Sequence, residues 1–178
     1  MSPSKPENAE SPVTRPLTEA EALRLSLALR DTPNILGYLP GELTGFSDAL
    51  VVESTTDGTL AGVCLIKRLP MNWADLAVLY VFPEHRNRGI GTRLFRDAFA
   101  RLRTERRHIL CVSREPSVLR RMEAERMRFI GSWQLPLPVQ WAYSRHYMSS
   151  YRFREAFRKQ AVFPKQPPFR YAVLRAET

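Results

Sequence analysis

The sequence has few cysteines and histidines and no long apolar run. Two cysteines and three histidines occur in 178 residues, and Cys64 and Cys111 each lie within an apolar run without a CxxC pair or a histidine cluster. We therefore predict reduced core cysteines and no metal site. No apolar stretch approaches the roughly 20 residues of a membrane-spanning helix. We expect no membrane span and a cytoplasmic protein.

The first 16 residues contain no apolar segment either. They read MSPSKPENAESPVTRP, in which Pro, Ser and Glu are frequent. We therefore expect no secretory signal here, and the segment cannot bury enough apolar surface to offset the entropy of ordering. We expect residues 1–16 to be a disordered tail and residues 17–178 to form one domain, because this length suits a single core.

Acidic residues are scarce in the second half of the chain. Residues 1–100 carry 10 Lys and Arg against 12 Asp and Glu, a net charge of −2, whereas residues 101–178 carry 17 against 6, a net charge of +11. The second half should therefore attract anions. Charge alone does not choose among a nucleotide cofactor, an acidic protein, nucleic acid and anionic lipid.

The apolar periodicity predicts a mixed α/β fold. Thr18 and Glu21 form a capping-box pattern at the start of a helix, and Asp57-Gly58 is typical of a hairpin turn. A strand that is followed by a helix and another strand implies a parallel pair joined by a right-handed crossover. The expected elements are a helix at 17–31, a hairpin at 49–69, a central strand ending at Phe82, a helix from Ile90, a strand at 108–113, a helix at 116–129, a strand at 129–137, a helix within 139–160 and a strand at 169–177.

An aromatic and basic segment interrupts this order at about 136–168. Tyr143, Tyr147 and Tyr151 recur every four residues among five basic residues, a spacing that predicts one amphipathic helix. Its aromatic stripe has three interpretations: packing on the sheet, a homodimer contact, or stacking and phosphate contacts with nucleic acid.

The most informative motif is the segment VFPEHRNRGIGTRLF, which begins at Val81. Its glycines precede a helix, and a helix N-terminus presents unpaired N–H groups that bind phosphate when the backbone can approach closely. Rival phosphate motifs do not fit: no Lys-Ser/Thr pair follows the glycines, and no third glycine completes a dinucleotide fingerprint. Arg-x-x-Gly-x-Gly after an apolar strand is what remains.

This pattern resembles the GCN5-related N-acetyltransferase (GNAT) family. The match runs through DLAVLYVFPEHRNRGIGTRLFRDA, residues 75–98, and extends more weakly over about 17–135 and 169–177. The resemblance implies a GNAT-like fold, with a mixed central sheet flanked by helices, and acetyl-CoA as co-substrate. It also implies that the loop backbone binds the pyrophosphate, that pantetheine lies along the central strand, and that the Leu79 N–H polarises the thioester. The cofactor-binding residues implied are Leu79, Tyr80, Val81, Arg86, Asn87, Arg88, Gly89, Ile90, Gly91 and Thr92.

The predicted catalytic residues are Asp75 and Tyr147. Acyl transfer to an amine needs a base, and Asp75 stands where several members of this family carry one, although its short arm needs a water relay and an Asp also suits a strand start. Ala124 occupies the position at which members of this family often carry the Tyr that acts as general acid. Either the thiolate leaves unaided, or Tyr143 or Tyr147 protonates it.

We therefore expect an acetyl-CoA-dependent N-acetyltransferase that transfers the acetyl group directly to a primary amine of a small molecule or protein. The basic second half mildly favours an acidic acceptor. The alternative is a degenerate CoA-binding module that binds nucleic acid or a protein partner through that half.

Overall fold

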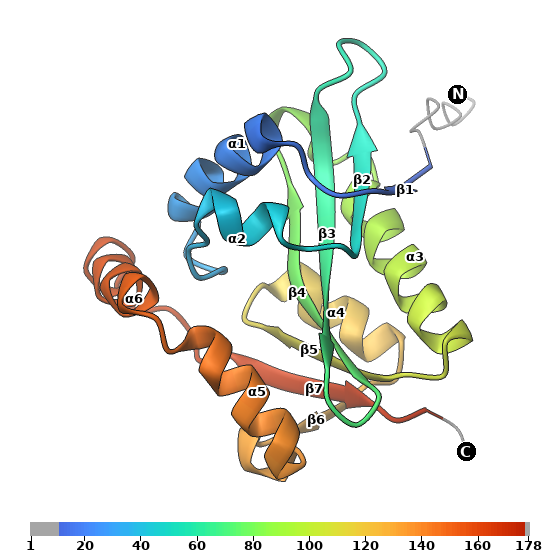
Figure 1. Cartoon of the computed structure of the whole chain (residues 1–178), viewed down its shortest axis with the longest axis vertical. Coiled ribbons are helices and arrows are strands. Elements are labelled where there is room, and N and C mark those ends of the chain that lie inside the picture. The colour runs from blue at the N-terminus through green and yellow to red at the C-terminus, as the bar shows by residue number, and fades with distance from the viewer. Residues whose placement is uncertain (1–10, 177–178) are drawn as a thin grey trace, which may run out of the picture.

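A seven-stranded mixed sheet forms the centre of the molecule (Figure 1). The computed structural model describes residues 11–176, with only the backbone described for residues 146 and 147. The strand order within this part is β1-β2-β3-β4-β5-β7-β6. The β4–β5 pair is parallel, as the crossover predicted, and the other neighbours are antiparallel. The strands are β1 (Val13–Thr14), β2 (Ala49–Glu53), β3 (Leu60–Leu69), β4 (Trp73–Val81), β5 (His108–Ser113), β6 (Arg128–Ile130) and β7 (Arg170–Leu174).

Helices cover both faces of this sheet. One apolar core lies under α3 and α4, and on the opposite face one core lies under α1 and α2 and another under α5. The helices are α1 (Glu19–Arg30), α2 (Pro40–Thr44), α3 (Ile90–Thr104), α4 (Pro116–Ala124), α5 (Leu137–Tyr147) and α6 (Ser150–Val162), with short 3-10 turns η1 (Pro83–His85) and η2 (Ser132–Gln134).

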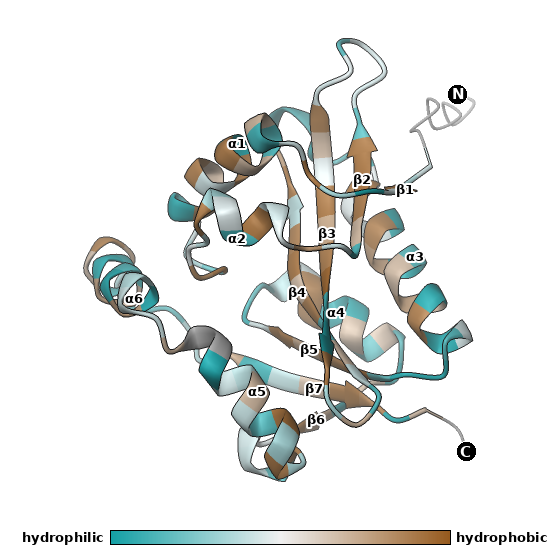
Figure 2. Cartoon of the chain, viewed as in Figure 1, coloured by the Kyte–Doolittle hydropathy of each residue, from teal (hydrophilic) through white to brown (hydrophobic). Residues whose placement is uncertain are grey.

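Burial on both faces explains the nearly continuous apolar runs of the central strands. In β3, Cys64 and Ile66 pack under α3, whereas Val63 and Leu65 pack under α1. Figure 2 shows the resulting hydrophobic colouring along much of β3 and β4. A strand that is buried on both sides carries apolar residues at every position rather than at alternate ones.

Several sequence-based expectations are confirmed. The Thr18 side chain accepts a hydrogen bond from the Glu21 N–H, and the Glu21 carboxylate accepts one from the Thr18 N–H, which completes the capping box. The hairpin at 49–69, the central strand, the helix from Ile90 and the strand at 108–113 also form.

Other boundaries were wrong. Val13–Thr14 pairs with Leu50 and Val51 of β2, so ordered chain begins before the predicted limit at residue 16; residues 1–10 lie outside the described part. The helix predicted at 116–129 ends at Ala124 and is followed by β6. The strand predicted at 129–137 stops at Ile130, and the chain turns through η2 before Pro138 enters α5.

The single helix predicted within 139–160 is two helices. α5 ends at Tyr147, and α6 begins after Ser149, whose hydroxyl accepts a hydrogen bond from the Arg152 N–H at 3.2 Å. A serine that caps a helix starts a new hydrogen-bonding ladder, because its side chain satisfies a donor that the preceding turn would otherwise take. Within the described residues, no helix is long and apolar enough to cross a membrane.

Lys159 fastens α6 to the loop after α1. It is buried, and its Nζ donates to the carbonyls of Leu29 and Thr32 at 2.5 and 2.6 Å and also to that of Ile35. We expect Lys159→Met to lower the free energy of unfolding by about 2–4 kcal/mol, because three carbonyls lose their charged donor. Denaturant unfolding measures this. Arg154→Met, at an exposed position of the same helix, is the control; an equal loss in both variants would contradict the role of Lys159.

Candidate functional site

The β4 and β5 strands separate part-way along their length. Their parallel pairing covers Trp73–Asp75 against His108–Leu110, whereas β4 continues to Val81 and β5 to Ser113. Both diverging ends line a cleft of about 1190 Å³. The C-terminal part of β4 therefore has β3 on one side and the cleft on the other.

A β-bulge turns selected backbone amides of β4 toward this cleft. Leu65 is opposite Val78 and Ile66 is opposite Leu76, so Ala77 is the extra residue. On the C-terminal side of the bulge, the Phe82 N–H donates to the Ala61 carbonyl at 3.0 Å, next to the start of β3.

In an antiparallel pair, successive residues point their N–H groups alternately toward and away from the partner strand, which assigns the direction of each amide in the C-terminal part of β4. Since Phe82 turns its N–H toward β3, Tyr80 does the same, whereas Leu79 and Val81 turn theirs toward the cleft. All three strand positions that the sequence suggested for backbone contacts line the cleft. The amides of Leu79 and Val81 face it, whereas the amide of Tyr80 faces β3.

The glycine loop positions the N-terminus of α3 at the same cleft. Asn87 and Gly89 adopt positive φ angles of 62° and 79°, and Gly89 is the residue that precedes the helix. The first N–H groups of a helix have no partner in the preceding turn. Asn87, Gly89, Ile90 and Gly91 all line the cleft, so this helix end is open to a ligand.

Arg86 and Thr92 of the predicted loop set also line the cleft, but their backbone N–H groups already have partners. The Arg86 N–H donates to the Pro83 carbonyl at 3.3 Å, and the Thr92 N–H donates to the Gly89 carbonyl at 3.1 Å. The Arg86 Nε donates to the Val81 carbonyl at 3.2 Å. Arg88 is exposed and is not part of the lining of the cleft.

Asp75 lies where the two strands begin to separate. It is 2% exposed, and burial raises the pKa of its carboxyl group to about 7, although the opposite charge of Lys67 opposes the shift. Lys67 is its cross-strand partner on β3, and burial lowers the pKa of this ammonium group to about 8. A carboxyl group with a pKa near neutrality can accept a proton at physiological pH.

The cleft reaches the neighbours of Asp75 rather than Asp75 itself. Leu76, Ala77 and Tyr171 line it, and burial together with the charge of Asp75 raises the pKa of the Tyr171 hydroxyl. Proton exchange between Asp75 and a ligand in the cleft therefore needs an intervening water or hydroxyl group, as the short arm of the side chain suggested.

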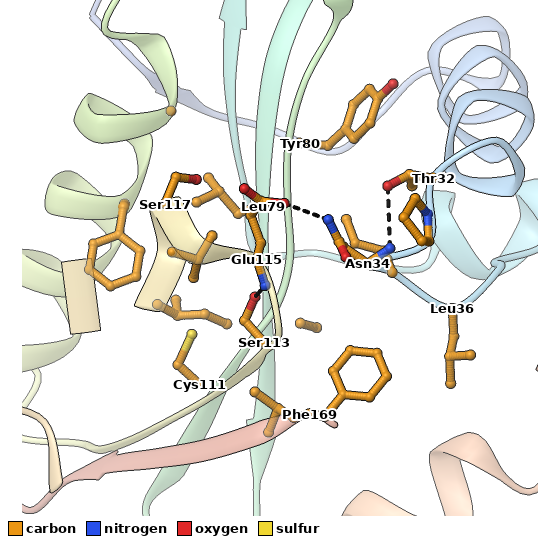
Figure 3. Close-up of a pocket in the computed structure, with 18 of the residues that line it drawn as sticks. Thr32, Asn34, Leu36, Leu79, Tyr80, Cys111, Ser113, Glu115, Ser117 and Phe169 are labelled. Carbon is orange, nitrogen blue, oxygen red and sulfur yellow. Dashed lines mark hydrogen bonds between the residues drawn. The ribbon is translucent and has the colours of Figure 1, made fainter. Parts of the chain in front are cut away.

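Two loops form a bridge across the cleft (Figure 3). The Asn34 side-chain amide, from the loop after α1, donates to the Glu115 carboxylate, which follows β5. The Arg114 Nη2 donates to the Pro33 carbonyl at 2.8 Å. The loop after α1 is therefore held as one wall of the cleft.

The far end of the cleft is built from α5, α6 and β7. Tyr143, Arg152, Phe153 and Tyr171 line it. Arg152 is 1% exposed, and its Nη2 donates to Glu42 at 2.9 Å. The side chain of Tyr147, the other predicted catalytic residue, lies outside the described part of the structure.

Sequence reasoning missed Asn34, Glu115, Arg121 and Arg152, all of which line the cleft. They come from the loop after α1, the start and middle of α4, and α6, and none of them belongs to a motif with a fixed spacing. No group of three or more His, Cys, Asp or Glu side chains that could hold a metal ion occurs in the described residues.

A forked parallel strand pair, a bulged central strand and a glycine-led helix N-terminus at one cleft define an acyl-CoA-dependent acyltransferase fold. The family model for GNAT acetyltransferases matches residues 15–118, which is more than half of the chain. The protein belongs to the GNAT acetyltransferase family. No curated protein sequence matches the chain.

Solved structures share this fold at low sequence identity. N-acetylglutamate synthase from Neisseria gonorrhoeae, complexed with coenzyme A and N-acetyl-glutamate, has a TM-score of 0.67 at 17% identity over 97% of this chain. This chain spans only 36% of that synthase. Rv2747 from Mycobacterium tuberculosis, in complex with CoA and NLQ, has a TM-score of 0.66 at 16% identity, covering 93% of this chain and 100% of the other. The putative acetyltransferase yncA from Salmonella typhimurium, with acetyl-CoA, has a TM-score of 0.61 at 12% identity over 95% and 96% of the two chains.

Proposed function

We propose that the protein transfers an acetyl group from acetyl-CoA to a primary amine in the forked cleft. The observation that carries this proposal is that the open N-terminus of α3 and the outward Leu79 amide meet at one cleft. Asp75, whose pKa is about 7, is the chain neighbour of the lining residue Leu76 and lies just behind the lining of this cleft. Family membership makes an acyl-CoA the expected donor.

The residues of the donor site have separate tasks in this proposal. The backbone N–H groups from Asn87 to Gly91 bind the pyrophosphate, because they combine a helix N-terminus with close backbone approach. The main chain of Leu79 and Val81 holds the pantetheine arm along the free edge of β4. The N–H of Leu79 stabilises the negative charge that develops on the thioester oxygen.

Asp75 acts as the base through a water molecule. Acetyl-CoA supplies an activated thioester, so that a C–N bond to the amine forms as the C–S bond breaks. The proton lost by the amine passes to Asp75, which is about half ionised at neutral pH. Tyr147 remains our predicted proton donor to the departing thiolate, and Tyr143 is the alternative that lines the cleft.

The acceptor that we propose is a small primary amine that carries a carboxylate. Among the described lining residues that α5, α6 and β7 contribute, the charged one is Arg152, and Lys67 is close enough for its pKa to respond to Arg152. Glu42 pairs with Arg152, and the two cations together exceed the charge of this carboxylate, which disfavours polyamines and favours an anionic group. The N-acetyl-glutamate bound to the Neisseria synthase adds support.

A thiol-release assay with purified protein tests the proposal. Acetyl-CoA is combined with a panel of free amino acids and with the matching decarboxylated amines. We expect turnover of some amino acids and at least about tenfold lower kcat/KM for their decarboxylated counterparts, the effect of a lost charged contact. Acetyl-CoA binding without turnover of any amine would overturn the enzymatic function and favour a CoA-binding module.

A further inference from the structure

Arg121 of α4 is a charged cleft residue that lies outside the glycine motif. It lines the cleft, and its Nη2 donates to the Thr92 hydroxyl at 3.0 Å. Nη2 also lies 3.9 Å from where a Cβ on Gly91 would be. Thr92 and Gly91 belong to the first turn of α3. The guanidinium of Arg121 is thus placed beside the N–H groups at the start of that helix.

This guanidinium has no carboxylate partner among the described residues. Its Nη1 donates to the Ser117 carbonyl of its own helix at 2.7 Å, and its buried Nε has no hydrogen-bond partner there. Burial lowers the pKa of Arg121, the nearby Arg120 adds to this effect, and the charge of Glu115 opposes it. A half-buried cation that forms no ion pair is costly, and it suits a site that an anionic ligand occupies.

We propose that the Arg121 side chain binds the pyrophosphate of the CoA donor and so favours CoA thioesters over pantetheine thioesters that lack phosphate. The inference rests on the proposed donor site. Two of the five N–H donors of the guanidinium are used by Thr92 and Ser117, and an arginine offers the remaining donors in a planar fork that matches phosphate oxygens. The pyrophosphate is favoured over the 3′-phosphate because Arg121 contacts the first turn of α3 itself.

The test compares ligand affinities of Arg121→Gln with those of Arg120→Gln. Arg120 is an exposed neighbour on the same helix, so the control loses the same charge without losing the contact. Isothermal titration calorimetry measures the Kd values of CoA, dephospho-CoA and pantetheine for both variants and the wild type. Arg121→Lys, which keeps the charge without the fork, is a third variant that guards against misfolding, and circular dichroism verifies each fold.

We expect Arg121→Gln to raise the Kd of CoA and that of dephospho-CoA by about 10–50-fold each, the loss of a charge-assisted contact. The Kd of pantetheine should be the same in Arg121→Gln and the wild type. For Arg120→Gln, the Kd of CoA should stay within about twofold of the wild-type value, as for a lost exposed charge. The Kd of CoA for Arg121→Lys should lie between those of the wild type and Arg121→Gln.

Three results would overturn the inference. The first is equal CoA affinity in Arg121→Gln and Arg120→Gln. The second is a loss that disappears with dephospho-CoA, which would assign Arg121 to the 3′-phosphate. The third is an equal loss for pantetheine. The proposed acetyltransferase activity fails on a different result, the absence of amine turnover by wild-type protein that binds CoA.

Discussion

Asp75→Asn is expected to lower kcat for amine acetylation at pH 7 by about 10²–10⁴-fold, the usual contribution of a positioned general base, with little change in acetyl-CoA affinity. The amide keeps the shape of the carboxyl group and cannot accept the proton of the amine. In the wild type, kcat/KM should fall as the pH drops below about 7, the pKa of Asp75, because the base becomes protonated. Steady-state kinetics across pH 5–9 measure both effects.

The same substitution should change how stability depends on pH. The pKa of Asp75 is raised in the folded state, from 3.8 to about 7, so the folded protein holds a proton that the unfolded chain has released. The contribution of Asp75 to wild-type stability should therefore fall by about 4 kcal/mol between pH 4 and pH 7, at 1.36 kcal/mol per pKa unit. Asp75→Asn should lack this fall, and urea unfolding at several pH values measures the difference.

Asp97→Asn is the control for both measurements, because Asp97 lies on α3 and is not part of the cleft lining. An unchanged kcat in Asp75→Asn would show that another group accepts the proton. A loss of kcat in both variants would point to a general effect of lowering the negative charge.

Gly89→Glu is expected to weaken acetyl-CoA binding by at least about 100-fold, because it brings a carboxylate to the N-terminus where the phosphate would bind. Gly89 has a φ of 79°, and a Cβ there would meet no atom within 4 Å. The substitution thus adds backbone strain of about 1–2 kcal/mol without a steric clash. Calorimetric titration with acetyl-CoA measures the loss.

Gly58→Glu separates the strain from the charge. Gly58 has a φ of 67°, its Cβ position is equally free, and it lies in the β2–β3 hairpin turn rather than in the cleft. Both variants should show similar losses of thermal stability, whereas only Gly89→Glu should lose affinity. Wild-type affinity in Gly89→Glu would mean that the cofactor phosphates bind elsewhere.

Local chemistry made much of the donor side predictable. The Thr18 capping box, the Asp57-Gly58 hairpin and the glycine loop each depend on neighbours within a few residues, so the sequence carries their structural instructions directly. The uninterrupted apolar run of β4 likewise indicated a strand buried on both faces. Because residues close in sequence make these interactions, the structure contains the capping box, the hairpin and the strand that the sequence predicted.

The helix break at Ser149 and the 3-10 turn after β6 show where local patterns were insufficient. The four-residue spacing of Tyr143, Tyr147 and Tyr151 continues across a break, so periodicity alone suggested one helix. A side-chain cap competes with helix propagation by only about 1 kcal/mol. Lys159 packs α6 on the loop after α1, and Arg152 packs it on α2 through Glu42. These are contacts that no local window contains.

The sequence by itself therefore determined the elements of the proposed donor site, because a strand, a glycine loop and a helix N-terminus follow one another between Asp75 and Thr92. Only the tertiary structure decided which amides of β4 face the cleft, that burial brings the pKa of Asp75 to about 7, and that Arg121 and Arg152 reach the same cavity. Those properties depend on the divergence of β4 from β5 and on desolvation by distant segments. Long-range packing causes both the strand divergence and the desolvation, so neither can be predicted from the spacing of residues in the sequence.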